Sequence, residues 1–244
     1  KAANKNDTMS AYNLALIYKN GLGVPKNDKE AYKYFLIAAN KNYAQAQYML
    51  GNMIEKGQGA KKDLKEAFSW FLKAAKQGHI LSEYRVGKMY RLGEGVAKSD
   101  TEAKKWYELS ANKGNSFAQV NLGMMYKQGV ATKQDYKEAF NWFEKSANQK
   151  NILGQLNLAL MYQNGLGVEK DLKEAFKLYQ LASDEGNSSN AQYNLGLMYL
   201  KGDGVEKNIN KTIEYWIKSS EQGFEVAKNS LEKLCKESPN SCKK

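Results

Sequence analysis

The residues Ala46–Gly78, AQYMLGNMIEKGQGAKKDLKEAFSWFLKAAKQG, contain two apolar-periodic segments of helical length joined by a short loop. Gly57 and Gly59 lie in that loop, and Gly78 closes the second segment. Apolar residues that recur every three to four positions are typical of amphipathic helices. Glycines between and after such segments are typical of turns and helix ends. The stretch therefore predicts a helix–turn–helix unit.

The same unit returns along the chain at an interval of 36 residues. A loop glycine recurs as Gly21, Gly57, Gly93, Gly129 and Gly165, and Gly202 follows after 37 residues. An alanine of the second helix recurs as Ala31, Ala67, Ala103, Ala139 and Ala175. A fixed period between about 20 and 50 residues indicates stacked supersecondary units. We therefore predict an all-α fold, a right-handed α/α superhelical solenoid of about six helix–turn–helix repeats with a C-terminal capping helix.

Each repeat is expected to hold a helix A followed by a helix B. Helix A is predicted at 9–20, 45–56, 81–92, 117–128, 153–164 and 190–201, and helix B at 28–41, 64–77, 100–113, 136–149, 172–185 and 209–222. The repeats then span approximately 9–43, 44–79, 80–115, 116–151, 152–188 and 189–224. Residues 1–8 are in phase with the end of a helix B, so we expect them to end a truncated preceding repeat. Residues 225–244 are expected to form a capping helix and tail.

Small and aromatic residues predict how the helices meet. Ala15, Gly51, Gly87, Gly123, Ala159 and Gly196 share one helix A position and face the helix B alanines. Glycine inside a helix costs about 1 kcal/mol relative to alanine, so close approach of helix B must compensate. Aromatic residues of helix B, such as Phe71 and Tyr107, are expected to fill the core between repeats.

The chain carries a formal charge of +11, and 26% of its residues are charged. The lysines are scattered over loops and outer helix faces with carboxylates between them, which favours a solvated cationic surface over a nucleic-acid site. We therefore expect an acidic protein partner and no nucleic acid, and leave the oligomeric state open. No run approaches the roughly 20 apolar residues of a membrane span. His79 is the only histidine, so a metal site with several histidine ligands is excluded. We expect no metal site of any other kind and no cofactor.

These residues carry a family resemblance. The pattern A-x-x-x-L-G-x-x-Y-x-x-G-x-G-V, followed by D-x-x-x-A-x-x-W-x-x-x-A-A-x-x-G, recurs six times from about Ser10 to Gly223. It resembles the Sel-one-like repeat (SLR), a relative of the tetratricopeptide repeat. Ala131 and Lys150 depart from it, because each replaces a glycine of the fourth unit. The resemblance implies a curved α/α superhelix that binds proteins or peptides, commonly in bacterial envelope or secreted contexts, and it implies no substrate.

Cys235 and Cys242 are the only cysteines, and Pro239 lies between them. The proline gives the chain a chance to turn back, so a disulfide could staple the cap; two free thiols in a cytosolic protein are the alternative. Relatives in the family that pair cysteines at similar spacing favour the bridge. A disulfide implies an oxidising compartment, so we expect a periplasmic or secreted protein, with a cytoplasmic location as the alternative.

The helix A face that remains after the core is assigned is the candidate partner-binding surface, on the side that is usually concave. Its expected members are Asn13, Arg85, Lys88, Asn121, Met125, Asn157 and Asn194. Asparagine can both donate to and accept from an extended peptide, and methionine repacks around varied partners. A groove without a ligand, and ordinary packing of the methionines, are the alternatives. Because arginine is frequent in binding hot spots, Arg85 is the foremost candidate, and Arg85→Glu is expected to leave the melting temperature nearly unchanged.

The sequence thus predicts a non-enzymatic protein–protein interaction module with no catalytic residues, a bacterial envelope scaffold or adaptor. One specific form is an immunity or inhibitor protein that blocks a secreted toxin through its concave surface. A penicillin-binding or β-lactamase-like hydrolase is the alternative, because Ser110–Lys113 and Ser230–Lys233 match S-x-x-K. Neither match has a convincing S-D-N or K-T-G partner.

Overall fold

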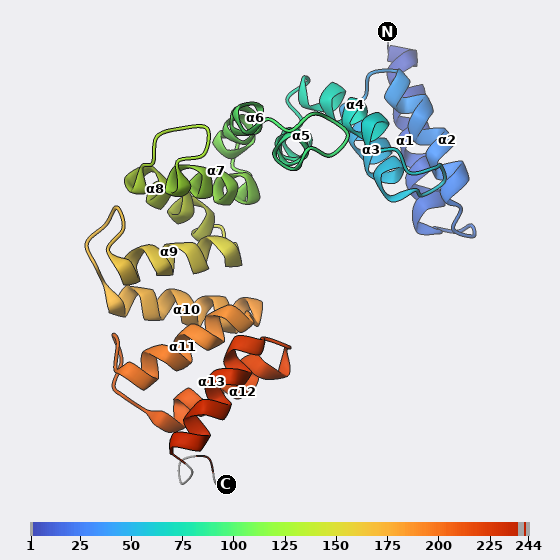
Figure 1. Ribbon diagram of the computed structural model, residues 1–244. Coiled ribbons are helices and arrows are strands. Elements are labelled where there is room, and N and C mark those ends of the chain that lie inside the picture. The colour runs from blue at the N-terminus through green and yellow to red at the C-terminus, as the bar shows by residue number, and fades with distance from the viewer. Residues whose placement is uncertain (1, 239–241, 243–244) are drawn as a thin grey trace. The chain divides into compact units, whose positions relative to one another are not determined.

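The computed structural model describes residues 2–238 and Cys242, with side chains from Asp7 onward, and this part of the chain holds thirteen α-helices and no strand (Figure 1). The A helices are α1 (Ala2–Asn20), α3 (Ala44–Lys56), α5 (Ile80–Leu92), α7 (Ser116–Gln128), α9 (Ile152–Asn164) and α11 (Ser189–Lys201). The B helices are α2 (Asp28–Asn40), α4 (Leu64–Ala75), α6 (Asp100–Asn112), α8 (Tyr136–Ala147), α10 (Leu172–Gly186) and α12 (Ile209–Glu221). The last helix is α13 (Glu225–Glu237). The predicted all-α helical solenoid is confirmed.

The helix bounds follow the 36-residue pattern, with one difference at the start of the chain. Helix α1 begins at Ala2 and continues without interruption to Asn20. Residues 2–8 therefore extend the first A helix, whereas the phase of the repeat had indicated the end of a preceding helix B.

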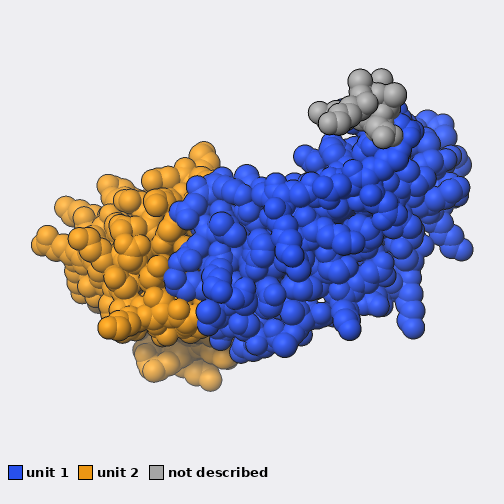
Figure 2. Space-filling model, turned by 90° about the horizontal axis from the view of Figure 1, so that it is seen from above, with its two compact units in different colours: residues 1–118 blue, residues 119–244 orange. Residues whose placement is uncertain are grey.

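The chain forms two compact units, residues 1–118 and 119–244 (Figure 2). In unit 1 each A helix packs on the B helix that follows it, and α2 and α4 also pack on the next A helix, α3 and α5. Unit 2 repeats this arrangement from α8 to α12, and α13 packs on α12. Each unit is thus a stretch of solenoid in which a helix contacts its neighbours in sequence.

Polar caps begin the B helices. Asp63 accepts hydrogen bonds from the backbone N–H groups of Lys65 and Glu66, each at 2.9 Å. Asp135 and Asp171 act in the same way. In α2 and α6 the acidic residue is already helical, and Asn27 and Ser99 are the caps instead. In these five B helices an acidic residue thus stands at the cap or in the first turn, where a carboxylate meets the positive end of the helix dipole.

Two kinds of glycine contact set the packing. A Cβ added at Gly87 of α5 would lie 2.8 Å from the ring of Tyr107, so the glycine lets the aromatic residue of α6 lie against the helix backbone. Gly59 has φ +74°, and a Cβ there would clash with the carbonyl oxygen of Asp28 in the preceding repeat. The first contact joins the two helices of one repeat, and the second stacks one repeat on the last.

Candidate interaction surfaces

One set of four positions in the A helices is half-buried or exposed in every repeat. They are spaced by four, three and four residues, so they lie on one side of the helix, which we call the outer A face. In unit 1 it consists of Met9, Asn13, Leu16, Asn20, Gln45, Met49, Asn52, Lys56, Leu81, Arg85, Lys88, Leu92 and, from α7, Phe117. In unit 2 it consists of Asn121, Met124, Gln128, Leu153, Asn157, Leu160, Asn164, Asn190, Asn194, Leu197 and Lys201. All the predicted partner-binding residues except Met125 belong to this face.

Met125 lies in the core and not on this surface. It is completely buried, and its equivalents Met89, Met161 and Met198 are at most 1% exposed. Each of these methionines follows the outer A face by one residue, which turns its side chain about 100° around the helix. The inclusion of Met125 among accessible partner contacts was therefore wrong.

The asparagines of the outer A face are partly used within their own helices. The Nδ2 of Asn157 donates to the carbonyl oxygen of Leu153 at 2.8 Å, and Asn164 does the same to Leu160. Asn52 of unit 1 donates to Tyr48 at 3.0 Å. In these three residues the amide donor is engaged, and the Oδ1 atom is presented as a hydrogen-bond acceptor.

Arg85 is part of an ion pair. Its guanidinium contacts the carboxylate of Glu55 on α3 and lies over the ring of Phe71, 5.3 Å from the ring centroid. The side chains of Arg85 and Glu55 are only 20% and 17% exposed. The arginine therefore bridges two consecutive A helices, and its charge is neutralised inside unit 1. The expectation that Arg85→Glu is neutral for stability does not fit this geometry.

Charge is separated between the two kinds of helix in unit 2. Helix α9 contains no charged residue, and α7 and α11 contain only Lys127 and Lys201. The B helices carry ion pairs, such as Lys177–Glu174 at 2.8 Å on α10 and Lys211–Glu214 at 2.8 Å on α12. The outer A face of α9 and α11 is accordingly a surface of leucine and asparagine, with Lys201 at its end.

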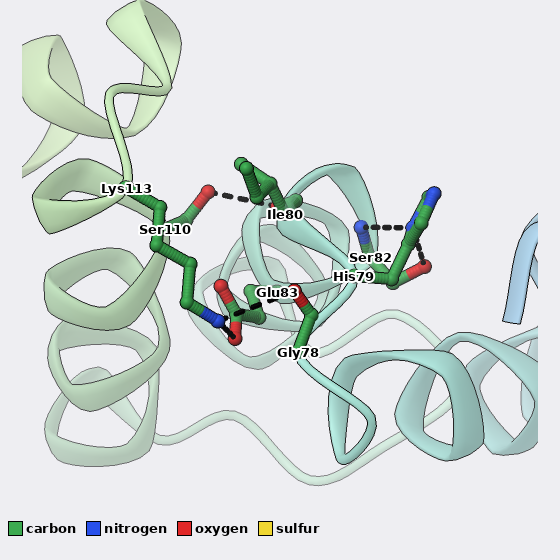
Figure 3. Close-up of polar contacts among 7 residues, drawn as sticks. All are labelled: Gly78, His79, Ile80, Ser82, Glu83, Ser110 and Lys113. Carbon is green, nitrogen blue, oxygen red and sulfur yellow. Dashed lines mark hydrogen bonds and ion pairs between the residues drawn. The ribbon is translucent and has the colours of Figure 1, made fainter.

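A row of polar pairs joins each of several A helices to the end of its helix B, and the sequence analysis missed it. In each pair the helix A residue is buried and its partner, just after helix B, is exposed. Gln77 donates to Gln47 at 2.7 Å, and the same contact recurs as Gln149 to Gln119 and Gln222 to Gln192. In the third repeat Glu83 and Lys113 take this place, with 2.5 Å between Oε1 and Nζ (Figure 3). The signal was available, because these polar residues recur with the repeat and their partners follow 30 residues later. Their sequence pattern resembles that of exposed residues, so burial was not expected.

The two S-x-x-K matches do not form a nucleophile and its base. The Ser110 hydroxyl is buried and donates to the carbonyl oxygen of Ile80 at 2.8 Å, while Lys113 contacts Glu83 and the carbonyl oxygen of Gly78 (Figure 3). Ser230 lies 3.4 Å from the Tyr193 hydroxyl, and Lys233 lies 3.9 Å from Glu237. Each serine and each lysine is thus engaged in a separate structural contact, and the hydrolase alternative gains no support from this geometry.

His79 is an N-cap. Its Nδ1 atom accepts a hydrogen bond from the backbone N–H of Ser82 at 3.3 Å and lies 2.9 Å from the Ser82 hydroxyl (Figure 3). The ring also packs against Tyr48, with 4.9 Å between centroids. Burial lowers the pKa of His79 below its ordinary value. The imidazole therefore serves as a neutral acceptor that starts α5.

A cavity of about 630 Å³ lies between two repeats of unit 1. The start of α2 lines it with Lys26, Asn27, Asp28 and Lys29, and the loop after α3 lines it with Gly57, Gly59, Ala60 and Lys61. A second cavity of about 430 Å³ lies at the start of α5, beside His79 and the exposed side chain of Leu81.

Cys235 and Cys242 form a disulfide, with 5.5 Å between their Cα atoms. The bridge ties Cys242 back to the last helical turn of α13 and confirms the expected pairing. Throughout residues 2–238, the helices are too short or too polar to cross a membrane.

Six segments of the chain match the Sel1 repeat: residues 8–43, 44–79, 80–115, 116–151, 152–187 and 189–224. The chain belongs to the Sel1 repeat family, whose members mediate protein–protein interactions and are generally non-catalytic.

Solved structures agree with this assignment. The chain is similar to a protective antigen present in uropathogenic Escherichia coli strains, with 36% identity and a TM-score of 0.87 over 96% of this chain. It covers 50% of that antigen, so it spans half the antigen's length. A Sel1 repeat protein from Oxalobacter formigenes is 27% identical, with a TM-score of 0.84 over 93% of this chain and 88% of that one.

A more distant likeness concerns the fold alone. The immunity protein PA5088 from Pseudomonas aeruginosa is 16% identical, with a TM-score of 0.51 over 94% of this chain and 82% of that one. A search of curated proteins returned no match.

Proposed function

We propose that this chain is a non-enzymatic scaffold or adaptor of the bacterial envelope, and that it holds a partner protein on the outer A faces of its repeats. The observation that carries the proposal is the separation of charge in unit 2. An interface core is depleted in charged residues relative to the remaining surface, and α9 presents Leu153, Asn157, Leu160 and Asn164 without one charge.

The exposed leucines add to this argument. Leu153 is 51% exposed at the start of α9, and Met9, Leu81 and Phe117 hold the same position in other repeats at 45–52% exposure. Single exposed apolar residues are ordinary, but a recurring column at one structural position supports a contact surface. Asn157 adds an oriented acceptor beside Leu153, which suits a partner that offers backbone N–H groups.

A location outside the cytoplasm is supported by two observations. The Cys235–Cys242 disulfide is the form that cysteines take in oxidising compartments. The relative with 36% identity is a protective antigen. We therefore place the protein in the periplasm or outside the cell.

A narrower role is that of an immunity or inhibitor protein that occludes a secreted toxin. Preformed helix faces need little ordering on binding, which favours tight occlusion, and a chain with a formal charge of +11 attracts an acidic partner. This narrower role rests on those two properties of the chain itself.

Two exposed leucines of unit 2 provide a matched test. Leu153 lies on the outer A face and is 51% exposed, whereas Leu181 lies on the B helix α10 and is 44% exposed. The wild-type chain and the variants Leu153→Gln and Leu181→Gln are used to capture proteins from the native envelope fraction, and the captured partner is then titrated against each.

Leu153→Gln should weaken the partner at least about tenfold, and Leu181→Gln by less than about twofold, with both melting temperatures nearly unchanged. The reverse order places the partner on helix B and contradicts the proposal. A nitrocefin assay covers the hydrolase alternative: turnover that is lost in Ser110→Ala would establish it.

A further inference from the structure

Lysines gather where the first two repeats of unit 1 stack. Lys26, Lys29 and Lys61 line the cavity of about 630 Å³ between the start of α2 and the loop after α3. Lys19 and Lys56 lie in the last turns of α1 and α3, next to these loops. Asp28 is the only carboxylate in the cavity lining, and its distance from Lys26 is 3.8 Å.

Most of this charge has no partner in the protein. Among the residues that the structure describes, Lys29, Lys56, Lys61 and Lys62 form no ion pair, in contrast to Lys113, Lys177 and Lys211. Burial lowers the pKa of Lys19, and repulsion from the ammonium group of Lys56 lowers it further. Asp28 raises this pKa, and Lys26 lowers it again. The positive charges are therefore close enough to oppose one another.

The equivalent place in unit 2 carries less positive charge. It lies between the start of α10 and the loop after α11, where Gly204 packs on Leu172 as Gly59 packs on Asp28. Three residues lower the charge relative to their equivalents in unit 1. Glu206 replaces Lys61, Asp171 replaces Asn27, and Gln163 replaces Lys19. Lysines remain at the equivalents of Lys26, Lys29, Lys56 and Lys62, which are Lys170, Lys173, Lys201 and Lys207. The three exchanges therefore account for the greater positive charge of the place in unit 1.

The loop that carries Lys26 also carries an exposed apolar side chain. Leu22, in the loop between α1 and α2, is 60% exposed. Inorganic phosphate gains nothing from such a group, whereas a protein segment with an apolar residue among its carboxylates can use both features. Asp28 in the lining also disfavours a compact dianion more than a segment whose carboxylates are spread along a chain.

We propose that these residues form a second docking site, which binds an acidic segment of a protein partner containing Asp, Glu and an apolar side chain. The inference rests on the proposed function, because it assumes a protein partner, but it assigns a surface outside the outer A face of unit 2. The outer A face of α9 supplies uncharged contacts, and this site supplies the attraction for acidic partners that the ion-paired Arg85 does not provide.

The test uses the full chain and a fluorescein-labelled peptide, Asp-Glu-Leu-Asp-Glu, with the amide peptide Asn-Gln-Leu-Asn-Gln as its uncharged match. Binding is measured by fluorescence anisotropy. Lys61→Glu installs the residue found at the equivalent position in unit 2, and Lys19→Gln does the same for Gln163, so both should fold. Lys133→Glu is the control, because it makes the same charge change at the matching position of the loop after α7.

We expect the acidic peptide to bind at least about tenfold more tightly than the amide peptide. Lys61→Glu and Lys19→Gln should each weaken it about fivefold or more, and Lys133→Glu less than about twofold. Equal losses for Lys61→Glu and Lys133→Glu would show that net charge alone acts and would overturn the inference. Binding of inorganic phosphate or anionic vesicles that is sensitive to Lys61→Glu, without peptide binding, would also overturn it.

The two proposals fail separately. If Leu153→Gln and Leu181→Gln behave as expected while Lys61→Glu has no effect, only the second docking site is wrong.

Discussion

The guanidinium of Arg85 on α5 is paired with the carboxylate of Glu55 on α3, and the two side chains join consecutive A helices of unit 1. Arg85 also covers the ring of Phe71. A residue at an outward helical position is in this case part of the contact between repeats. Its neighbour on the same face, Lys88, is half-exposed and forms no ion pair with any residue that the structure describes. The two cations of α5 therefore have different roles.

Arg85→Glu should destabilise unit 1. The substitution places two carboxylates together in a mostly covered contact, and breaking such a pair costs about 1–3 kcal/mol when some solvent still reaches it. Urea unfolding followed by circular dichroism measures the change. Lys88→Glu is the control and should move stability by no more than about 0.5 kcal/mol. The exchange Glu55→Arg with Arg85→Glu should restore at least half of the loss, and no recovery would mean that the pair is not responsible.

Gly87→Val should cost more than about 2 kcal/mol, because the new side chain enters the space of Tyr107. Gly87→Ala should cost less, because α1 and α9 accommodate Ala15 and Ala159 at the equivalent position. Thermal and urea unfolding of both variants check the order. Equal stability of wild type and Gly87→Val would contradict the close approach of α5 and α6.

His79 should make stability depend on pH below about 6.5, its ordinary pKa. Its pKa is lowered in the folded chain, so the unfolded chain binds the proton more readily and stability falls as pH drops from 7 to 5. A protonated ring also cannot accept the Ser82 N–H, and a lost cap costs about 1 kcal/mol. His79→Asn is a matched variant, because Asn115 and Asn151 cap α7 and α9 at this position. The variant should lose the extra slope between pH 7 and 5, and parallel curves would refute the role of His79.

Ala131→Gly should stabilise the chain. Ala131 has φ +54°, a region that costs a residue with a Cβ about 1–2 kcal/mol relative to glycine, offset in part by the greater freedom of glycine in the unfolded chain. We expect a net gain of roughly 0.5–1 kcal/mol in urea unfolding. The converse change Gly59→Ala, at the equivalent loop position, should destabilise, because its Cβ clashes with the Asp28 carbonyl. A loss of stability in Ala131→Gly would show that its methyl group makes a favourable contact.

The period of 36 residues was sufficient to predict the helices, because glycines and capping residues recur at fixed distances from the apolar positions. The outer A face followed from the same periodicity, and Asn157 and Asn194 lie on it as expected. Met125 was misplaced because a single 100° step separates a groove residue from a core residue. The Arg85–Glu55 pair joins residues that are 30 positions apart in different repeats. The periodicity within one repeat could not predict it, because the contact depends on how two A helices pack. The stacked loops around Lys61 required knowledge of how one repeat packs on the next.

The contact of the buried Glu83 with Lys113 limits how repeats can be recombined. Both residues belong to the third repeat, and the neighbouring repeats place Gln47 with Gln77 and Gln119 with Gln149 at these positions. A crossover in the loop between helix B and the next helix A moves such a pair as a whole. A crossover in the loop between helix A and helix B would leave Glu83 facing a glutamine, and a buried carboxylate without a cation is costly. The exchangeable cassette of this solenoid therefore begins at a helix A and ends after its own helix B.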